Sequence, residues 1–298
     1  GSPANLAVYS AFVPIGGKIM GLKLSSGGHL THAQSVSMTG KIWKPVLFEV
    51  DPKTELLNYE VIKSLAVKEK PDLIVVGFTA YPRIIDFKKF RKIANACGAH
   101  LHVDMSHFAG LVAGGVYPSP FPFADSVMTT THKTLRGPRH ALIFVKKDKR
   151  ELDRKIDKAI IPGLQGGPHE NTIAAVAVAL KEASSLSFRR YAKQVVKNAK
   201  VLADSLAALG WRVVSGGTDS HLILVDTWAS GISGKEASDR LEKAGIIVNM
   251  NTIPGDSRTV MDPSGIRLGT AAETTEGKKE KDMLNIAKKI DKILRAKR

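Results

Sequence analysis

The chain has 298 residues, of which 43% are hydrophobic, and this length supports a large core divided between two domains. We expect no membrane span and no signal peptide, because no run approaches the roughly 18 uninterrupted apolar residues that cross a bilayer. The single cysteine, Cys97, excludes an internal disulfide framework and a cysteine-based zinc site. A cytoplasmic protein is therefore the default expectation.

The formal net charge is +16. Such an excess could serve nucleic acid, a membrane surface or anionic metabolites. The lysines, however, are scattered over many predicted helices, and no basic run is interleaved with aromatic residues. We interpret most of the charge as solvated surface, which makes nucleic acid an unlikely partner.

The first predicted element is a helix, with Ser2 as its N-cap and Pro3 as its first residue. A helix start with Gly1, Ser2 and free backbone amides could bind an anion. An ordinary capped helix explains the same residues without a ligand.

Strands and helices then alternate along the first half of the chain. Strands are predicted at residues 18–22, 46–50, 73–77, 101–105, 126–129 and 141–145, and helices at 59–68 and 87–97. This alternation indicates an α/β fold with a mostly parallel sheet and helices on both faces.

A long helical region from 172 to 209, with a break near 184–187, separates this part from the remainder of the chain. Further elements follow: strands at 211–214, 222–225, 246–248 and 264–270, and helices at 235–244 and around 283–294. We therefore predict a large domain over residues 1–183 and a smaller C-terminal α/β domain over 184–298.

Four chemically active residues fall at or just after predicted strand ends: Thr79, Asp104, His107 and Lys133. Ligands of such sheets bind beyond the carboxyl ends of the strands, so these residues are expected to share one site. Lys133 lies between hydroxyls and a histidine, which suits an amine nucleophile acting on a carbonyl. A solvated surface lysine is the simpler alternative. No G-x-G-x-x-G or Walker A pattern is present, which disfavours the nucleotide-binding folds that carry them.

Other segments carry weaker signals. Two glycines before His29 suggest a loop that lets the ring approach a ligand. His29 and His32 alone do not make a metal site, and none is predicted. The loop 162–169 contains three glycines and could hold a phosphate, or could simply precede a helix. Arg267 lies within an apolar strand, where an arginine usually has an anionic partner such as a carboxylate.

These pieces match what pyridoxal phosphate requires of a protein. This cofactor needs a lysine for its aldehyde, an acid for its ring nitrogen, amides for its phosphate and a flat side chain over its ring. Lys133, Asp104, the Gly1–Ser2 helix start and His29 could meet these needs. Arg267 could then hold an amino-acid carboxylate in a bidentate pair.

Seven stretches of the chain, in order, resemble the serine hydroxymethyltransferase family. They are residues 1–9, 27–32, 103–107, 129–135, 162–168, 214–219 and 264–270. The resemblance covers nearly the whole chain. It implies a fold-type I pyridoxal-phosphate transferase that reversibly converts serine and tetrahydrofolate to glycine and 5,10-methylenetetrahydrofolate through a lysine Schiff base, and that forms a homodimer.

The resemblance also implies roles for individual residues. Lys133 would form the Schiff base, Asp104 would pair with the ring nitrogen, and His29 would stack on the ring. Thr79 and His107 would contact the region of the phenolic oxygen.

Further roles follow from the same resemblance. His132 and Thr130 would act beside the lysine, and Arg267 would bind the substrate carboxylate. The phosphate would be held by Gly1 and Ser2, with Gly166 and Gly167 reaching the phosphate in the partner subunit. The folate would contact Leu24, Gly28, Leu30 and Asn251.

The chain departs from the family pattern in three places. It opens at Gly1 without an initiator methionine, and the family's preceding segment, which supplies a proton-handling glutamate and tyrosines, is absent. Thr79 stands where serine is common, and residues 138–141 (Pro-Arg-His-Ala) replace the family's usual pair of small residues after the arginine. We therefore expect impaired activity from the chain as given. The alternatives are a folate-independent aldolase for β-hydroxy amino acids, or an inactive chain that binds the cofactor or RNA.

Overall fold

A six-stranded sheet, in the order β2-β1-β3-β4-β5-β6, forms the centre of the first half of the chain in the computed structural model, which describes residues 1–147 and 151–296. Its strands are β1 (Lys18–Leu22), β2 (Lys44–Phe48), β3 (Leu73–Val76), β4 (His100–Asp104), β5 (Ser126–Thr130) and β6 (Ala141–Val145). Strands β1 to β5 pair in parallel and β6 is antiparallel to β5. The predicted mostly parallel sheet is confirmed.

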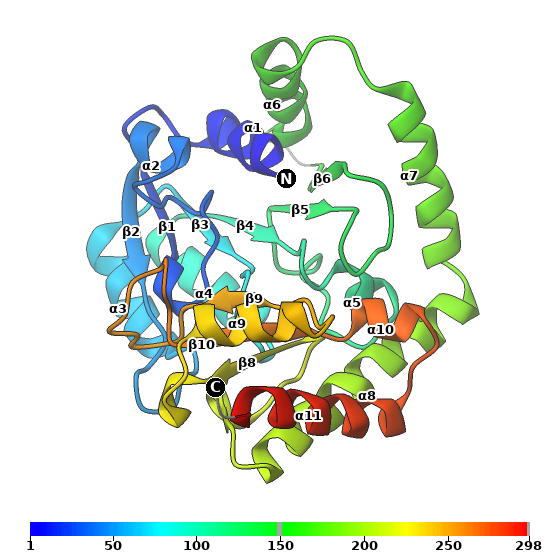
Figure 1. Ribbon diagram of the computed structural model, residues 1–298. Coiled ribbons are helices and arrows are strands. Elements are labelled where there is room, and N and C mark those ends of the chain that lie inside the picture. The colour runs from blue at the N-terminus through cyan, green and yellow to red at the C-terminus, as the bar shows by residue number, and fades with distance from the viewer. Residues whose placement is uncertain (148–150, 297–298) are drawn as a thin grey trace.

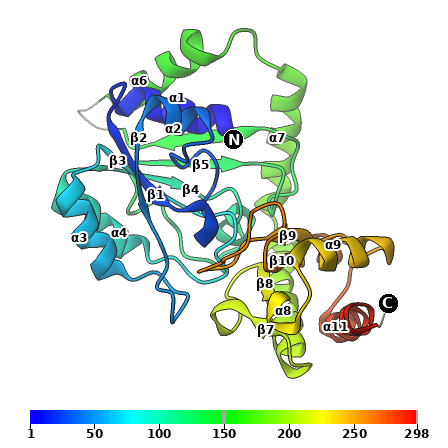
Figure 2. The same cartoon turned by 60° about the vertical axis from the view of Figure 1, so that its left-hand side comes forward.

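Helices cover both faces of this sheet (Figures 1 and 2). On one face lie α1 (Ser2–Phe12) and α6 (Leu152–Lys158), and on the other α3 (Tyr59–Glu69) and α4 (Phe87–Cys97). In strand β3, successive side chains point to opposite faces of the sheet, so the strand packs against the helices on both sides. Leu73 and Val75 pack in the cluster that contains α1 residues, whereas Ile74 and Val76 pack in the cluster of α3 and α4.

Local signals set the ends of these helices. Asn58 and Asp86 precede α3 and α4, and their side chains accept hydrogen bonds from the backbone N–H groups of Val61 and Lys89. Gly98 follows α4 in the left-handed conformation. The prediction for the first helix was wrong in one detail, because Gly1 is the N-cap of α1 and Ser2 is already helical. The hydroxyl of Ser2 therefore does not cap the helix.

Two long helices lead to the second half of the chain. Helix α7 (Glu170–Ala183) is mostly exposed and stands beside the body of the molecule (Figure 1). Helix α8 (Leu186–Ala208) starts at the side-chain cap of Ser185. Its first half packs in the core of the large sheet, and its second half, from Ala199, packs in the core of the C-terminal elements.

A four-stranded antiparallel sheet, in the order β7-β8-β10-β9, forms the C-terminal part. Its strands are β7 (Arg212–Val213), β8 (Leu222–Asp226), β9 (Asn249–Asn251) and β10 (Gly265–Gly269), and its helices are α9 (Gly234–Lys243), α10 (Ala271–Thr275) and α11 (Glu280–Arg295). Short helices in the described part of the chain include α2 (Met38–Ile42), α5 (Ala109–Ala113) and the irregular turn η2 (Ala159–Leu164).

The strand predicted at 246–248 was misplaced. Gly245 closes the preceding helix with a positive φ of 79°, and the apolar residues after it do not pair. Pairing with β10 begins only at Asn249. Ile246 and Val248 pack against the core of the C-terminal elements, whereas Ile247 between them is exposed.

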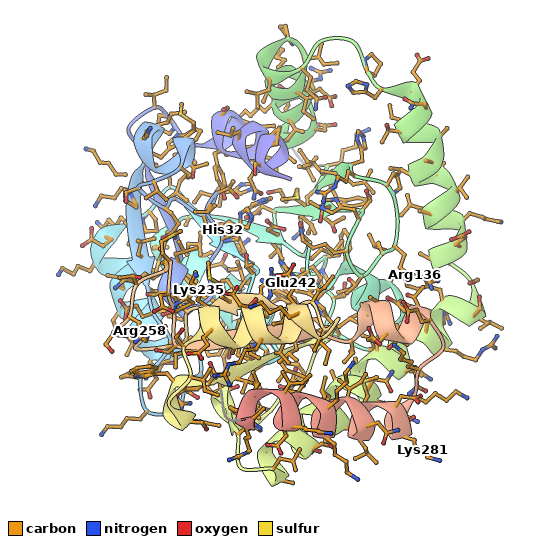
Figure 3. All side chains as sticks on the ribbon, in the orientation of Figure 1. His32, Arg136, Lys235, Glu242, Arg258 and Lys281 are labelled. Carbon is orange, nitrogen blue, oxygen red and sulfur yellow. The ribbon has the colours of Figure 1, made fainter. Side chains whose placement is uncertain are left out.

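Charged side chains of the C-terminal part face outward, including those of Lys235 and Glu242 on α9 and Lys281 on α11 (Figure 3). His32, by contrast, lies inside the large unit. Helices capable of crossing a membrane do not occur in the described part of the chain.

Candidate active site

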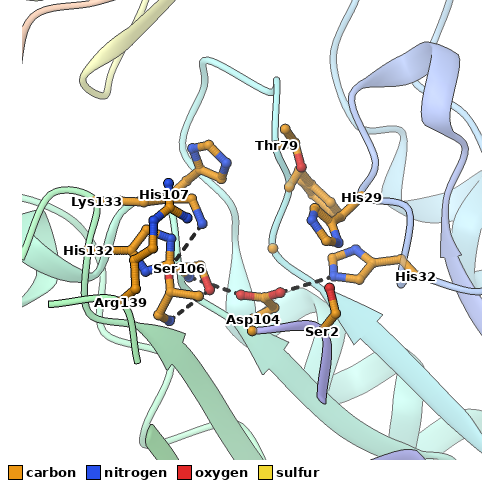
Figure 4. A pocket seen from close by; sticks show the side chains of 14 residues that line it. Ser2, His29, His32, Thr79, Asp104, Ser106, His107, His132, Lys133 and Arg139 are labelled. Atoms are coloured by element: carbon orange, nitrogen blue, oxygen red, sulfur yellow. Dashed lines mark hydrogen bonds and ion pairs between the residues drawn. The ribbon is translucent and has the colours of Figure 1, made fainter. Parts of the chain in front are cut away.

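A cavity of about 230 Å³ lies beyond the carboxyl ends of β3, β4 and β5. It brings together nine of the residues predicted from the sequence: Gly1, Ser2, His29, Thr79, Asp104, His107, Thr130, His132 and Lys133. Figure 4 shows them in two groups, with His107, His132 and Lys133 on one side and His29 and Thr79 on the other. Asp104 lies between the groups at the base of the cavity.

Lys133 follows β5, and its Nζ donates a hydrogen bond of 3.1 Å to Thr130 Oγ1. Burial lowers the pKa of Lys133; the nearby charge of Asp104 raises it, while Arg267 and Arg139 lower it again. A lower pKa increases the fraction of neutral amine near pH 7, and this neutral form attacks carbonyl carbons. The lysine is therefore placed and tuned as a nucleophile.

Asp104 ends β4 and is buried. Its Oδ2 accepts hydrogen bonds from Asn5 Nδ2 at 3.0 Å and His32 Nε2 at 3.3 Å, and its Oδ1 accepts one from the Ser106 N–H at 3.0 Å. Burial by itself raises the pKa of this carboxyl, but the donors from His32, Ser106 and Asn5 outweigh burial and hold the pKa well below its usual range. The carboxylate stays charged in a site where a cationic ring nitrogen could pair with it.

His29 presents a neutral ring to the cavity. Burial, followed by the charge of His32, lowers the pKa of His29 to about 4. Its Nδ1 lies 2.7 Å from Thr31 Oγ1, which fixes the ring from behind. A fixed, uncharged, flat ring is suited to stacking on another ring.

The N-terminal end of α1 opens into the same cavity. Backbone N–H groups at a helix start have no partners within the helix, and the helix dipole favours negative charge there. Gly1 packs so closely on β5 that a Cβ at this position would lie 2.7 Å from Thr130 Cγ2. Arg139 and Lys133 line the same cavity and add positive charge. The arrangement suits a phosphate group.

Thr79 and Arg267 join the two halves of the chain at the site. Arg267, on β10, donates hydrogen bonds to the backbone oxygen of Thr79 and to Asn249 Oδ1, each at 3.0 Å. The Thr79 hydroxyl is buried and has no hydrogen-bond partner within the described part of the chain. Buried hydroxyls rarely remain unpaired, so this atom is available for a ligand.

His107 stacks on His221, with ring centroids 5.9 Å apart and an interplanar angle of 18°. Burial lowers the pKa of His107 well below its usual value, and that of His221 to about 3. Two neutral rings from the two halves of the chain therefore meet at the edge of the cavity.

Other predicted residues do not line the cavity. Gly166 and Gly167 lie in an exposed loop before α7. The four predicted folate contacts also lie outside it: Leu24, Gly28, Leu30 and Asn251. Asn251 pairs with Gly265 on the strand that carries Arg267. These positions remain predictions.

The sequence reasoning missed several residues that shape the site. Asn5 and Ser106 hold Asp104, and Arg139 lines the cavity. His32 was considered only for metal binding, yet its Nε2 faces Asp104. Within residues 1–147 and 151–296, no three His, Cys, Asp or Glu side chains gather as a metal site.

The residues present fit pyridoxal phosphate. A partly buried amine, a carboxylate whose pKa lies well below its usual range, a neutral stacking ring and an unpartnered hydroxyl surround one cavity. A helix start for the phosphate lies at its edge. Each of these groups corresponds to one part of the cofactor.

Comparison with known proteins agrees with this chemistry. The family model described as serine hydroxymethyltransferase matches residues 1–290. A serine hydroxymethyltransferase from Desulfotalea psychrophila is 52% identical over 294 residues, which cover 99% of this chain and 68% of that relative. The chain belongs to the serine hydroxymethyltransferase family, whose members are fold-type I enzymes that use pyridoxal phosphate, with tetrahydrofolate as co-substrate.

Proposed function

We propose that this chain catalyses the family reaction, the reversible transfer of a one-carbon unit between serine and tetrahydrofolate, at the cavity around Lys133. When bound, pyridoxal phosphate supplies an electron sink that weakens the Cα–Cβ bond of serine. The single observation that supports the proposal most is the placement of Lys133 and Asp104. Asp104 ends β4, Lys133 follows the neighbouring strand β5, and both line the same cavity.

Each group around the cavity has a task in this proposal. The Lys133 amine binds the aldehyde carbon, and the ionised Asp104 accepts a hydrogen bond from the ring nitrogen. His29 covers one face of the ring, and Thr79 and His107 bind near its phenolic oxygen. Thr130 holds the lysine amine through the 3.1 Å contact.

In this proposal the amino group of Gly1 and the backbone N–H of Ser2, at the start of α1, would bind the phosphate. His132 and Arg139 line the same cavity. Burial lowers the pKa of His132, followed by the charges of Lys133 and Arg139. A neutral His132 can accept or return a proton beside the lysine.

Arg267 binds the substrate carboxylate in this proposal. Burial lowers its pKa, but a guanidinium remains charged at neutral pH. We assign the folate to Leu24, Gly28, Leu30 and Asn251, on the resemblance alone.

We also propose a homodimer in which Gly166 and Gly167 reach the partner's phosphate site. The exposed apolar side chains of α7, Ile173, Val178 and Leu180, support this assembly. We propose a domain division between residues 183 and 184, near the break between α7 and α8, and a cytoplasmic location.

Titration of the purified chain with pyridoxal phosphate tests the proposal. We expect a visible absorption band that disappears in Lys133→Ala and persists in Lys235→Ala, a matched change at an exposed lysine on α9. Added glycine should change the band. A band that survives Lys133→Ala would contradict the role of this lysine.

Assays of the cofactor-loaded chain then separate reaction types. Cleavage of serine that depends on tetrahydrofolate supports the proposed function. Cleavage of threonine with no effect of tetrahydrofolate on serine would instead assign a folate-independent aldolase.

A further inference from the structure

Three polar residues of β4 lie in one row behind the cavity. His100, His102 and Asp104 alternate with apolar residues, so their side chains project from the same face of the strand. Helix α1 crosses this face with Asn5 and two aromatic residues. Its aromatic residues Tyr9 and Phe12 lie against His102 and His100, with ring centroids 6.0 Å and 4.2 Å apart, respectively.

Asn5 is fully buried, and both the nitrogen and the oxygen of its side-chain amide make hydrogen bonds behind the cavity. Its Nδ2 donates to Asp104 Oδ2 at 3.0 Å and to Thr31 Oγ1 at 2.9 Å. Its Oδ1 lies 3.0 Å from His102 Nε2. Because the ionised carboxylate of Asp104 can only accept, the amide nitrogen must face it, and this fixes the orientation of the amide.

The orientation of the Asn5 amide determines where His102 and Ser126 carry their protons. Its oxygen can only accept, so His102 carries a proton on Nε2. Burial lowers the pKa of His102 to about 3, so the ring is neutral and its Nδ1 is an acceptor. Ser126, the register partner of His102 on β5, lies 2.8 Å from this Nδ1 and must donate its hydroxyl proton.

Ser126 has one proton, which it gives to His102. The Nε2 atom of His100 lies 2.9 Å from the same hydroxyl oxygen, so it is the donor of that bond. Every donor in the row from His100 through Ser126, His102 and Asn5 therefore points toward Asp104. At its far end, His100 lines a second cavity of about 540 Å³ beside Phe12.

We propose that Asn5, His102 and Ser126 are positioning residues, and that their one-directional hydrogen-bond relay orients Asp104 toward the ring nitrogen of the cofactor. Aligned hydrogen bonds polarise one another, so each donor strengthens the next. The proposal rests on the proposed role of Asp104.

The relay also couples two parts of the cofactor site. The second N–H of the Asn5 amide donates to Thr31 Oγ1. The Thr31 hydroxyl therefore donates its own proton to His29 Nδ1, 2.7 Å away. The backbone N–H of Thr31 donates to the same Nδ1 at 3.2 Å. One buried amide thus holds both the carboxylate at the ring nitrogen and the ring that stacks above it.

The proton pattern can be measured in the ligand-free chain. Nitrogen-15 NMR of labelled histidines distinguishes the two neutral tautomers and the cation. We expect His102 to be neutral at pH 7 with its proton on Nε2, and Ser126→Ala to shift its Nδ1 resonance. A cationic His102, or one protonated on Nδ1, would overturn the relay.

Variants test whether the relay acts on the cofactor. In His102→Phe the donor to Asn5 is lost, and we expect the dissociation constant of pyridoxal phosphate to rise about tenfold, as for a buried hydrogen bond. The visible circular dichroism of the bound cofactor should fall as Asp104 loses its fixed orientation. His102→Gln restores a donor and should return both values to within about twofold.

Tyr9→Phe is the matched control, because Tyr9 is buried against the same ring but its hydroxyl makes no hydrogen bond in the described chain. It should bind the cofactor like the unaltered chain. If His102→Gln is as weak as His102→Phe, ring packing and not donation matters, and the proposal is wrong. If the chain does not bind pyridoxal phosphate through Lys133, the proposed function is wrong. The NMR measurement of the His102 tautomer does not depend on cofactor binding and tests the hydrogen-bond relay separately.

Discussion

Arg267 Nη1 donates a hydrogen bond of 3.0 Å to the backbone oxygen of Thr79, across 188 positions of the chain. This contact ties β10 of the small sheet to the segment that follows β3 of the large sheet. Arg83 supports the same junction, since it pairs with Asp219 at 3.1 Å. The two halves of the chain therefore form the site together, with the arginine held next to the cavity before any substrate binds.

Replacing Arg267 by lysine tests its role toward the substrate. Lysine keeps the charge but loses the planar fork that grips a carboxylate through two bonds. We expect the apparent dissociation constant for glycine, read from the visible band of the cofactor-loaded chain, to rise about 10- to 100-fold. The KM for serine should rise similarly, with a smaller change in kcat.

Arg240→Lys is a suitable control for this change. Arg240 pairs with Glu236 on α9 at 2.7 Å, away from the cavity. It should leave glycine binding unaltered. Unchanged glycine binding in Arg267→Lys would remove Arg267 from the carboxylate site.

Replacing Thr79 should affect stability and cofactor binding differently, because its buried hydroxyl has no hydrogen-bond partner in the described part of the ligand-free chain. Thr79→Val keeps the shape and removes the unpaired group, so the free energy of unfolding without cofactor should stay the same or increase by up to about 1 kcal/mol. Cofactor affinity should nevertheless fall about five- to tenfold, because the hydroxyl is reserved for the ligand. Urea unfolding and cofactor titration measure the two effects.

Thr134→Val provides the contrast. The Thr134 hydroxyl is paired twice, accepting from the Gly110 N–H and donating to the His107 oxygen, each at 3.0 Å. Its loss should lower the free energy of unfolding by about 1–3 kcal/mol. If Thr79→Val is equally destabilising without cofactor, the Thr79 hydroxyl has an undetected structural partner.

Much of the large sheet and its site could be predicted from local sequence. Continuous apolar runs identify the buried strands, and their ends position Thr79, Asp104, His107 and Lys133. The support for Asp104 could not be predicted in this way, because Asn5 meets it only through the packing of α1 on the sheet. The alternation of histidines with apolar residues in β4 was the available signal.

Two predictions from the sequence, the strand at 246–248 and the N-cap at Ser2, were wrong for a similar reason. The apolar run at 246–248 suggested a strand, but pairing depends on the position of β10 and begins at Asn249. Ser2 suggested an N-cap by residue type, whereas the backbone turns helical one residue earlier. Strand register and the first residue of a helix depend on tertiary contacts, which sequence patterns do not contain.

Gly77, the residue directly after β3, should be irreplaceable because it packs against the backbone of Asp104. Its φ is +115°, and a Cβ there would lie 1.8 Å from the backbone oxygen of Asp104. Gly77→Ala should therefore lower the free energy of unfolding by more than about 3 kcal/mol, because backbone would have to move. Gly98→Ala is the control: φ is +75° but no atom lies within 4 Å, so only strain of about 1 kcal/mol applies. Equal effects in urea unfolding would show that close packing at Gly77 is unimportant.

Three histidines, of which His102 and His221 are buried and His29 is partly buried, predict how the free energy of unfolding depends on pH. Burial lowers the pKa of His29 to about 4, and those of His102 and His221 to about 3, against roughly 6.5 in the unfolded chain. Between these limits the unfolded chain binds more protons than the folded chain. Their contribution to stability is therefore complete above about pH 6.5 and is lost as the pH falls, by at most about 1.4 kcal/mol per pH unit for each histidine.

Urea unfolding at pH 7 and pH 5 measures this loss. We expect His221→Gln to reduce the difference between the two pH values by up to about 2 kcal/mol. His169→Gln, at an exposed histidine, should leave the difference unchanged. A free energy of unfolding that is equal at both pH values would contradict neutral, buried histidines. A decrease that His221→Gln does not alter would mean that His221 titrates normally in the folded chain, and that its stacked ring is open to protonation.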